Sequence, residues 1–215
     1  MKFGLIGAGH WGKNLLSNLY EMNLLHSVAE YNLTLRESLQ NKYTEIKFYE
    51  DYKQIIEADL QAVVIATPAH THFSLAKEAL EAKKHVFVEK LFTLSVHEAC
   101  ELVDLAHEKN KILMVGHLLL YQPAIMWIKN FLAEGKLGNV YSLHQERLNH
   151  GKVRSVENVL WSLGVHDIAV INHLVPASLE SIVVVGQAAL QKKIEDDIYL
   201  HLLFNDNTQD SFSRK

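Results

Sequence analysis

The first twelve residues carry the strongest chemical signal in the chain. Four of its ten glycines lie there, and three belong to the motif Gly7-Ala8-Gly9-His10-Trp11-Gly12, a G-x-G-x-x-G that separates an apolar segment from a helical pattern. In such a turn Gly7 permits a tight bend, Gly9 lets the backbone approach a pyrophosphate, and Gly12 lets helix and strand pack closely. Free N–H groups at the helix start complete an anion site. We expect this turn, including His10 and Trp11, to contact a dinucleotide; the alternative is an ordinary glycine-rich turn.

An acidic residue follows at the spacing that a ribose contact requires. Glu30 ends the second predicted strand, 18 residues after Gly12, within the range where a carboxylate accepts hydrogen bonds from the hydroxyls of an adenosine ribose. A carboxylate there also repels a 2′-phosphate, so the sequence favours NAD over NADP. The alternative is an ordinary exposed glutamate at a strand end.

Three further candidate residues follow the most apolar predicted strand, residues 62–66. Thr67, Pro68 and His72 fall on the loop at the carboxyl edge of the expected sheet, where nucleotide ligands sit, and we expect them to contact the cofactor. His70 and His72 flank a single residue without an accompanying carboxylate pair, so no metal site is expected.

Five stretches carry a resemblance to a known family: residues 7–14, 62–72 (AVVIATPAHTH), 79–90 (ALEAKKHVFVEK), 115–123 (VGHLLLYQP) and 164–168 (GVHDI). Together they resemble the glucose-fructose oxidoreductase/inositol dehydrogenase/rhizopine-catabolism (Gfo/Idh/MocA) family of NAD(P)-dependent sugar dehydrogenases, and the likeness covers nearly the whole chain. The resemblance implies a hydride transfer between a nicotinamide cofactor and a secondary hydroxyl of a sugar, cyclitol or nucleotide-sugar. Residues 147–149 and 158–161 further resemble a branch found among polysaccharide and nucleotide-sugar enzymes.

The resemblance also implies two catalytic residues. The family has Glu-Lys-Pro at the end of the fifth strand, with the lysine facing the substrate hydroxyl; here the stretch is Glu89-Lys90-Leu91, and the missing proline should leave Lys90 less constrained. Glu89 is expected beside the cofactor. The family's Asp-x-x-x-His corresponds to Ser162 and His166, so a hydroxyl stands where a carboxylate would orient the imidazole or bind substrate.

These residue types suit the oxidation of an alcohol. The hydroxyl proton must be removed while a hydride leaves, and negative charge develops on the oxygen. We expect His166 to be the general base and Lys90 to hydrogen-bond the reacting oxygen. Acid–base assistance contributes about 10²–10⁴-fold, so Leu91 and Ser162 could reduce turnover while NAD binding persists. The alternative functions are therefore a catalytically impaired nucleotide-binding protein and an interaction subunit.

The elements that must position these residues alternate between strand and helix patterns, which predicts a doubly wound parallel sheet covered by helices, a Rossmann fold. Helices are expected over 33–42, near 51–58, and over 74–82 and 95–110, with another starting near 15. Six strands are expected, over residues 3–6, 26–31, 46–49, 62–66, 85–88 and 112–115.

The pattern changes after Gly116. We expect an NAD(P)-binding domain over residues 1–118 and an α+β domain for substrate and oligomerisation over 119–215, with helices over 123–134 and 158–174 and longer strands over 140–149, 179–189 and 194–204. Family members are longer, so this second domain is expected to be truncated at the C-terminus, with an open, mostly antiparallel sheet. An unpaired sheet edge invites another chain, and a homo-oligomer is expected.

Composition narrows the function classes. The 215 residues are 48% apolar and 21% charged, which excludes disordered and collagen-like chains. The net charge of −4, without a concentrated basic block, argues against nucleic acid as a partner, and no apolar run approaches a membrane span. The single cysteine, Cys100, and the absence of a signal-peptide pattern favour a reducing, cytoplasmic location. The Lys83-Lys84 pair is expected to be a solvated helix end.

Overall fold

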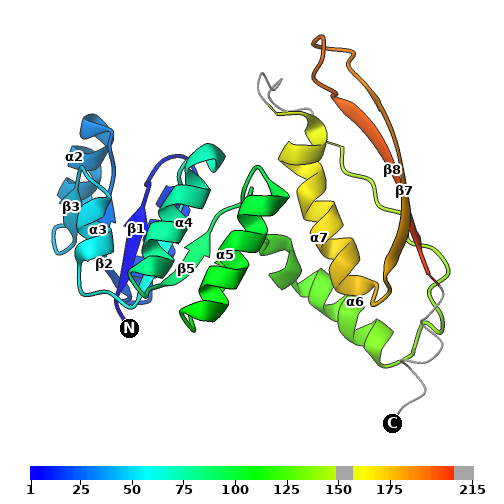
Figure 1. The fold of residues 1–215 in the computed structure, drawn as a ribbon, viewed down its shortest axis with the longest axis horizontal. Helices are drawn as coiled ribbons and strands as arrows, with labels where there is room; N and C mark the ends of the chain where they lie inside the picture. The colour runs from blue at the N-terminus through cyan, green and yellow to red at the C-terminus, as the bar shows by residue number, and fades with distance from the viewer. Residues whose placement is uncertain (149–156, 206–215) are drawn as a thin grey trace. The chain divides into compact units, whose positions relative to one another are not determined.

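The computed structural model describes residues 1–148 and 157–205. The chain divides into two units, one from Met1 to Gly116 and one that begins at His117 (Figure 1).

The first unit is built on a six-stranded sheet in which every neighbouring pair is parallel. The strand order is β3-β2-β1-β4-β5-β6, which is the doubly wound order of dinucleotide-binding folds, and it confirms the predicted fold class. The order reverses between β1 and β4, so the crevice outside their carboxyl ends is the expected ligand site. The strands are β1 (Phe3–Ile6), β2 (Leu25–Ala29), β3 (Lys47–Tyr49), β4 (Ala62–Ile65), β5 (His85–Val88) and β6 (Leu113–Val115).

Alternation along the central strands divides the core between the two faces of the sheet. Leu5 and Val64 pack in one cluster with Leu16 of α1, whereas Ile6 and Val63 pack in the other with residues of α4 and α5, as the two-residue period of a strand requires. In Figure 1, α4 and α5 lie side by side over the sheet. The helices are α1 (Gly12–Glu21), α2 (Leu33–Lys42), α3 (Lys53–Glu57), α4 (His72–Glu81) and α5 (Val96–Glu108).

One lysine of this unit departs from expectation. Lys84 is buried, and its Nζ donates to the carbonyl oxygens of Ala58 at 2.7 Å and Leu60 at 3.2 Å. Burial lowers the pKa of this ammonium group. The expectation of a solvated pair is therefore wrong for Lys84 and holds only for its exposed neighbour Lys83.

The second unit contains helices and one antiparallel strand pair within its described residues. A 3₁₀ turn, η2 (Leu118–Tyr121), precedes α6 (Pro123–Ala133), which is followed by Gly135 at a φ of +68°, the left-handed conformation that favours glycine after a helix. One π-helical turn, η3 (Leu160–Gly164), leads into α7 (Val165–Leu174) where a single helix was expected. The strands are β7 (Leu179–Gln187) and β8 (Asp197–Phe204).

The strand predicted over residues 140–149 is wrong as far as the structure describes it. Residues 140–148 form no strand, and Asn149 lies outside the described residues. Alternating apolar residues form a strand only where a neighbour accepts the backbone hydrogen bonds. Within the described part of this unit, β7 and β8 pair only with each other.

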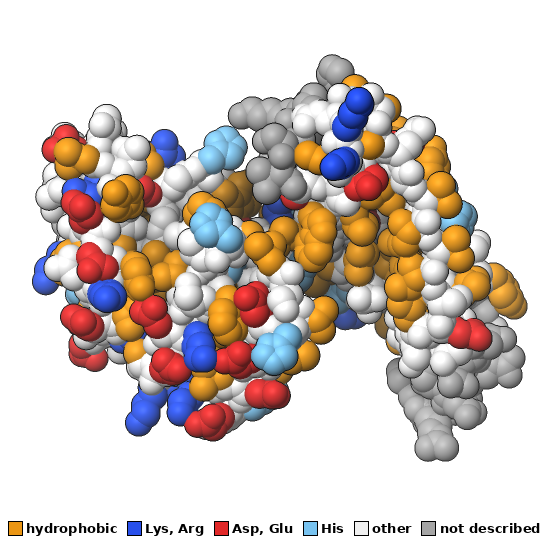
Figure 2. Space-filling view, turned by 45° about the horizontal axis from the view of Figure 1, so that its top comes forward, with side chains coloured by type: hydrophobic (Ala, Val, Ile, Leu, Met, Phe, Trp, Pro, Cys, Tyr) orange, Lys and Arg blue, Asp and Glu red, His pale blue; other side chains and the backbone are white. Residues whose placement is uncertain are grey.

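The strand pair exposes much apolar surface. All nine residues of β7 are exposed, among them four consecutive β-branched residues, Ile182 to Val185. Figure 2 shows apolar side chains gathered over the second unit. Separately, none of the helices in the described ranges combines the length and apolar character of a bilayer-spanning segment.

Candidate functional site

The glycine turn links β1 to α1 at the reversal point of the sheet. Gly7 has a φ of +87°, and a Cβ atom there would lie 2.8 Å from the carbonyl oxygen of Ala66. A Cβ on Gly12 would lie 2.2 Å from the carbonyl oxygen of Gly7, whereas a Cβ on Gly9 would meet nothing within 4 Å. Two glycines are thus required by the fold itself. Gly9 borders open space, as a backbone that a pyrophosphate approaches should.

Glu30 follows β2 with its carboxylate fixed by backbone donors. Oε2 accepts the N–H of Ala8 at 2.8 Å, and Oε1 accepts the N–H of Asn32 at 2.9 Å. The first bond ties the carboxylate directly to the glycine turn, 22 residues earlier. The carboxylate is therefore held at the carboxyl edge of the sheet, beside the turn that would bind the pyrophosphate.

Arg36 is a neighbour of Glu30 that the motif spacing did not single out. Its Nη1 donates to the carbonyl oxygen of Glu30 at 2.7 Å, and its Nη2 pairs with Glu50 at 2.8 Å. An arginine near this position can instead accept the 2′-phosphate of NADP. Here the guanidinium already bonds to a carboxylate and a carbonyl. Only its position six residues after Glu30 could have drawn attention to it.

The loop after β4 lies against the glycine turn. Cγ2 of Thr67 would be 2.9 Å from a Cβ on Gly7, so the structure brings together two segments that sequence analysis assigned to one site. The Thr67 and Thr71 hydroxyls are 2.6 Å apart, and the Thr71 hydroxyl donates to the carbonyl oxygen of Pro68 at 2.8 Å. They add to the backbone bond from the N–H of Thr71 to the carbonyl oxygen of Pro68, at 2.9 Å, in the 3₁₀ turn η1 (Ala69–Thr71) that precedes α4.

His72 lies in α4 and not on the loop where it was expected. Its side chain is buried, with 1% of the residue exposed, at the first position of α4. Nε2 lies 2.8 Å from the carbonyl oxygen of Thr67, and Nδ1 lies 2.5 Å from that of Leu91. The ring thus joins the loops that follow β4 and β5, because neighbouring parallel strands end at the same edge.

Glu89 directly follows β5 in a largely buried position, with 7% of the residue exposed. Oε1 accepts the indole N–H of Trp11 at 2.7 Å, and Oε2 accepts the N–H of Lys90 at 3.2 Å. Burial raises the pKa of the Glu89 carboxyl; the two hydrogen bonds and the charges of Lys90 and His72 act in the opposite direction. Gly116 packs against this carboxylate, since a Cβ there would lie 3.0 Å from Oε1.

Lys90 and His166 belong to different units. Lys90 follows Glu89, is partly exposed and is joined to Leu91 by a cis peptide bond. His166 lies in the first turn of α7, and the buried Ser162 precedes it in η3, where its hydroxyl donates to the carbonyl oxygen of Val159 at 3.4 Å. The pairing of Lys90 and His166 in one active site therefore stays a prediction.

Asp167, beside His166, bonds to residues of the preceding segment. Nε of Arg147 donates to both of its carboxylate oxygens at 2.8 Å, and Gln145 donates to Oδ1. Asp167 is thus held by Arg147, the first residue of the stretch 147–149 that resembles the nucleotide-sugar branch. Sequence analysis did not anticipate this ion pair, because 20 residues separate its members.

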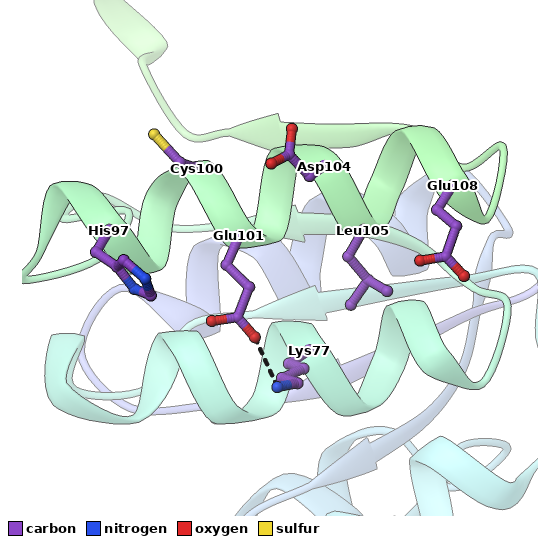
Figure 3. A pocket seen from close by; sticks show the side chains of 7 residues that line it. All are labelled: Lys77, His97, Cys100, Glu101, Asp104, Leu105 and Glu108. Carbon is purple, nitrogen blue, oxygen red and sulfur yellow. Dashed lines mark hydrogen bonds and ion pairs between the residues drawn. The ribbon is translucent and has the colours of Figure 1, made fainter.

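A separate groove of about 700 Å³ lies between α4 and α5 (Figure 3). Lys77 of α4 pairs there with Glu101 of α5 at 2.6 Å, among further carboxylates of α5. None of the predicted site residues lines this groove. Within residues 1–148 and 157–205, no three His, Cys, Asp or Glu side chains are arranged to hold a metal ion.

Comparison with known proteins gives a family match over the first unit. Residues 1–117 match the GFO_IDH_MocA model, described as an oxidoreductase family with an NAD-binding Rossmann fold. The chain is 30% identical over 196 residues to UDP-N-acetylglucosamine 3-dehydrogenase of Acidithiobacillus ferrooxidans, covering 91% of this chain and 61% of that protein. It is 26% identical over 183 residues to inositol 2-dehydrogenase of Salmonella paratyphi B, covering 81% of this chain and 54% of that protein.

A crystal structure extends the comparison to three dimensions. The UDP-N-acetylglucosamine 3-dehydrogenase GnnA of A. ferrooxidans superposes with a TM-score of 0.85 at 29% identity, over 95% of this chain and 64% of that one. The similarity therefore includes described parts of both units. The chain spans less than two thirds of the length of each of these relatives.

Proposed function

Because the chain belongs to the GFO_IDH_MocA family of oxidoreductases with an NAD-binding Rossmann fold, we propose that it is an NAD-dependent dehydrogenase acting on a secondary hydroxyl of a sugar, cyclitol or nucleotide-sugar. The observation that carries the proposal is the junction of the glycine turn, the Glu30 carboxylate and the segment that bears Lys90 at one edge of one sheet. We assign the cofactor to residues 1–118 and the substrate to residues 119–215.

The residues at this edge fit a dinucleotide. Gly9 leaves open space, Gly7 and Gly12 form a turn that excludes side chains, and Glu30 presents a fixed carboxylate to a ribose. Thr67 and Pro68 supply the adjoining loop. When bound, NAD supplies the hydride acceptor; the protein's own contribution is to bind, orient and handle the proton.

Two side chains would handle that proton and the developing charge. His166 acts as the general base that removes the hydroxyl proton, and Lys90 donates a hydrogen bond to the oxygen as it becomes an alkoxide. Ser162 stands where family members carry an aspartate, so the imidazole has a hydroxyl nearby in the chain instead of a carboxylate. The second candidate function, nucleotide binding without turnover, is favoured by Ser162 and by Leu91.

A panel assay tests the function. With saturating NAD we expect reduced-nicotinamide absorbance to rise with UDP-N-acetylglucosamine, myo-inositol or a free sugar as substrate, and calorimetry to register NAD binding. Binding without turnover on any of these compounds would favour the second candidate. Absence of NAD binding would overturn both candidates.

Glu30 is expected to set the cofactor preference. In Glu30→Gln, the side-chain NH₂ group would face the backbone N–H of either Ala8 or Asn32, so one of these two hydrogen bonds is lost. The change also removes the charge that repels a 2′-phosphate. A hydrogen bond to a charged group is worth about 1.5–3 kcal/mol, so we expect NAD to bind about 10- to 100-fold more weakly and the preference over NADP to shrink. Calorimetry with both cofactors measures this, with the exposed Glu37→Gln as the matched control. Unchanged affinities for both cofactors would contradict the role.

The proposal also includes a cytoplasmic location and association with a second copy. The free, exposed Cys100 supports a reducing compartment. The exposed β-branched residues of β7 support association.

A further inference from the structure

We propose that Trp11 and His72 are positioning residues that fix the lysine segment, Glu89–Leu91, from its two ends. The inference rests on the proposed function in one respect, namely that Lys90 acts on the substrate oxygen. Neither anchor needs to touch substrate; each acts through the backbone or side chains on either side of Lys90.

The first anchor runs from the glycine turn. Trp11 stands between Gly9 and Gly12, and its indole N–H reaches across 78 residues of sequence to Oε1 of Glu89 at 2.7 Å. The other oxygen of this carboxylate accepts the N–H of Lys90 at 3.2 Å. One buried carboxylate therefore connects the turn that would bind the pyrophosphate to the backbone of the catalytic lysine. In a low-dielectric site such charge-assisted bonds are stronger than neutral ones.

The second anchor runs from the loop after β4. His72 bridges the carbonyl oxygens of Thr67 and Leu91 with its two ring nitrogens, at 2.8 Å and 2.5 Å. A carbonyl oxygen can only accept a hydrogen bond, so a ring nitrogen must donate to it. A neutral imidazole has one N–H and can donate to one of the two carbonyl oxygens, whereas a protonated imidazole can donate to both.

The two anchors share a design. Each involves a loop expected to contact the cofactor: Trp11 lies in the glycine turn, and His72, at the first position of α4, bonds to Thr67. Each also bonds to a residue adjacent to Lys90. Cofactor binding at either loop is thereby coupled to the placement of the lysine. Trp11, His72 and Glu89 were each expected to contact the cofactor directly. The bonds of Trp11 to Glu89 and of His72 to Leu91 support an indirect role instead.

Three variants test the anchors. Trp11→Phe keeps an aromatic ring but removes the donor, His72→Phe removes both donors, and His72→Gln keeps one donor and also serves if His72→Phe does not fold. Trp127→Phe is the matched control, since Trp127 is 62% exposed on α6. We expect hydrogen exchange at the Lys90 amide to accelerate at least about tenfold in the anchor variants and not in the control.

A spectroscopic titration tests the indole bond directly. The difference in emission between the wild type and Trp11→Phe isolates Trp11 from the other two tryptophans, Trp127 and Trp161. Burial raises the pKa of the Glu89 carboxyl, and the charges of Lys90 and His72 oppose this shift. We therefore expect the difference signal to change with pH, with a midpoint above the pKa of an ordinary glutamate. The transition should vanish in Glu89→Gln. A purely structural role for Trp11 would leave the signal without this transition.

Kinetics complete the test. Since a displacement of about 1 Å can cost about 10²-fold in rate, we expect kcat to fall about 10- to 100-fold in Trp11→Phe and His72→Phe while KM for NAD changes little. Wild-type exchange rates and kcat in both variants would overturn the anchors and leave the proposed function standing. If the wild type shows no turnover, the proposed function fails, and amide exchange and the emission titration still decide on the anchors.

Discussion

Replacing Lys90 with methionine is expected to lower kcat about 10²–10³-fold while NAD binds as tightly as before. The change removes the ammonium donor and keeps a side chain of similar length, so the alkoxide that develops during hydride departure loses its hydrogen bond. Removal of one such donor typically costs this factor. Steady-state rates, with the substrate that the panel assay identifies, and calorimetric titration with NAD measure the two effects separately.

The control for this prediction is Lys53→Met, which removes a lysine from an exposed position on α3 and should leave both quantities unchanged. A Lys90→Met protein that turns over at the wild-type rate would show that another group stabilises the alkoxide. Loss of NAD affinity in the same protein would place Lys90 in the cofactor site.

Alanine substitutions at Gly12 and at Gly9 should have different effects on stability and on NAD binding. Gly12→Ala places a Cβ 2.2 Å from the Gly7 carbonyl oxygen, and backbone cannot move aside as a flexible side chain can. We expect the free energy of unfolding to fall by about 3 kcal/mol, the upper part of the usual overpacking cost, and NAD binding to be lost with the turn. Urea unfolding and calorimetry measure the two consequences.

Gly9→Ala is the matched partner, because its Cβ would meet no protein atom within 4 Å. Its stability should equal that of the wild type. NAD should nevertheless bind about 10- to 100-fold more weakly, since the methyl group would stand where the pyrophosphate meets the backbone and bonds to charged groups are worth about 1.5–3 kcal/mol each. Wild-type NAD affinity in Gly9→Ala would place the dinucleotide elsewhere.

The elements that were predicted correctly are those whose determining interactions are local. The helix over 33–42 begins where Asn32 accepts the N–H of Leu35 at 2.9 Å, a cap three residues away in the chain. The central strand at 62–65 is uniformly apolar and therefore buried on both faces. The glycine spacing located the turn for the same reason, because the conformation of Gly7 and the contact of Gly12 arise within six residues.

The predictions that were wrong concern residues whose structure depends on a partner distant in the sequence. The pattern at 140–149 predicts a strand, yet 140–148 form none. Lys84 was expected in solvent, but the carbonyl oxygens of Ala58 and Leu60 line a buried site for its ammonium group. Burial and pairing depend on what the fold brings near, which the local pattern does not contain.

The sequence by itself determined the doubly wound sheet, the position of the glycine turn and the acidic residue that follows β2, because strand periodicity, glycine conformation and motif spacing act over short stretches of chain. Only the tertiary structure decided that Trp11 bonds to Glu89 and that His72 bridges Thr67 and Leu91. These contacts join residues up to 78 positions apart, and they exist because parallel strands β1, β4 and β5 end at a common edge.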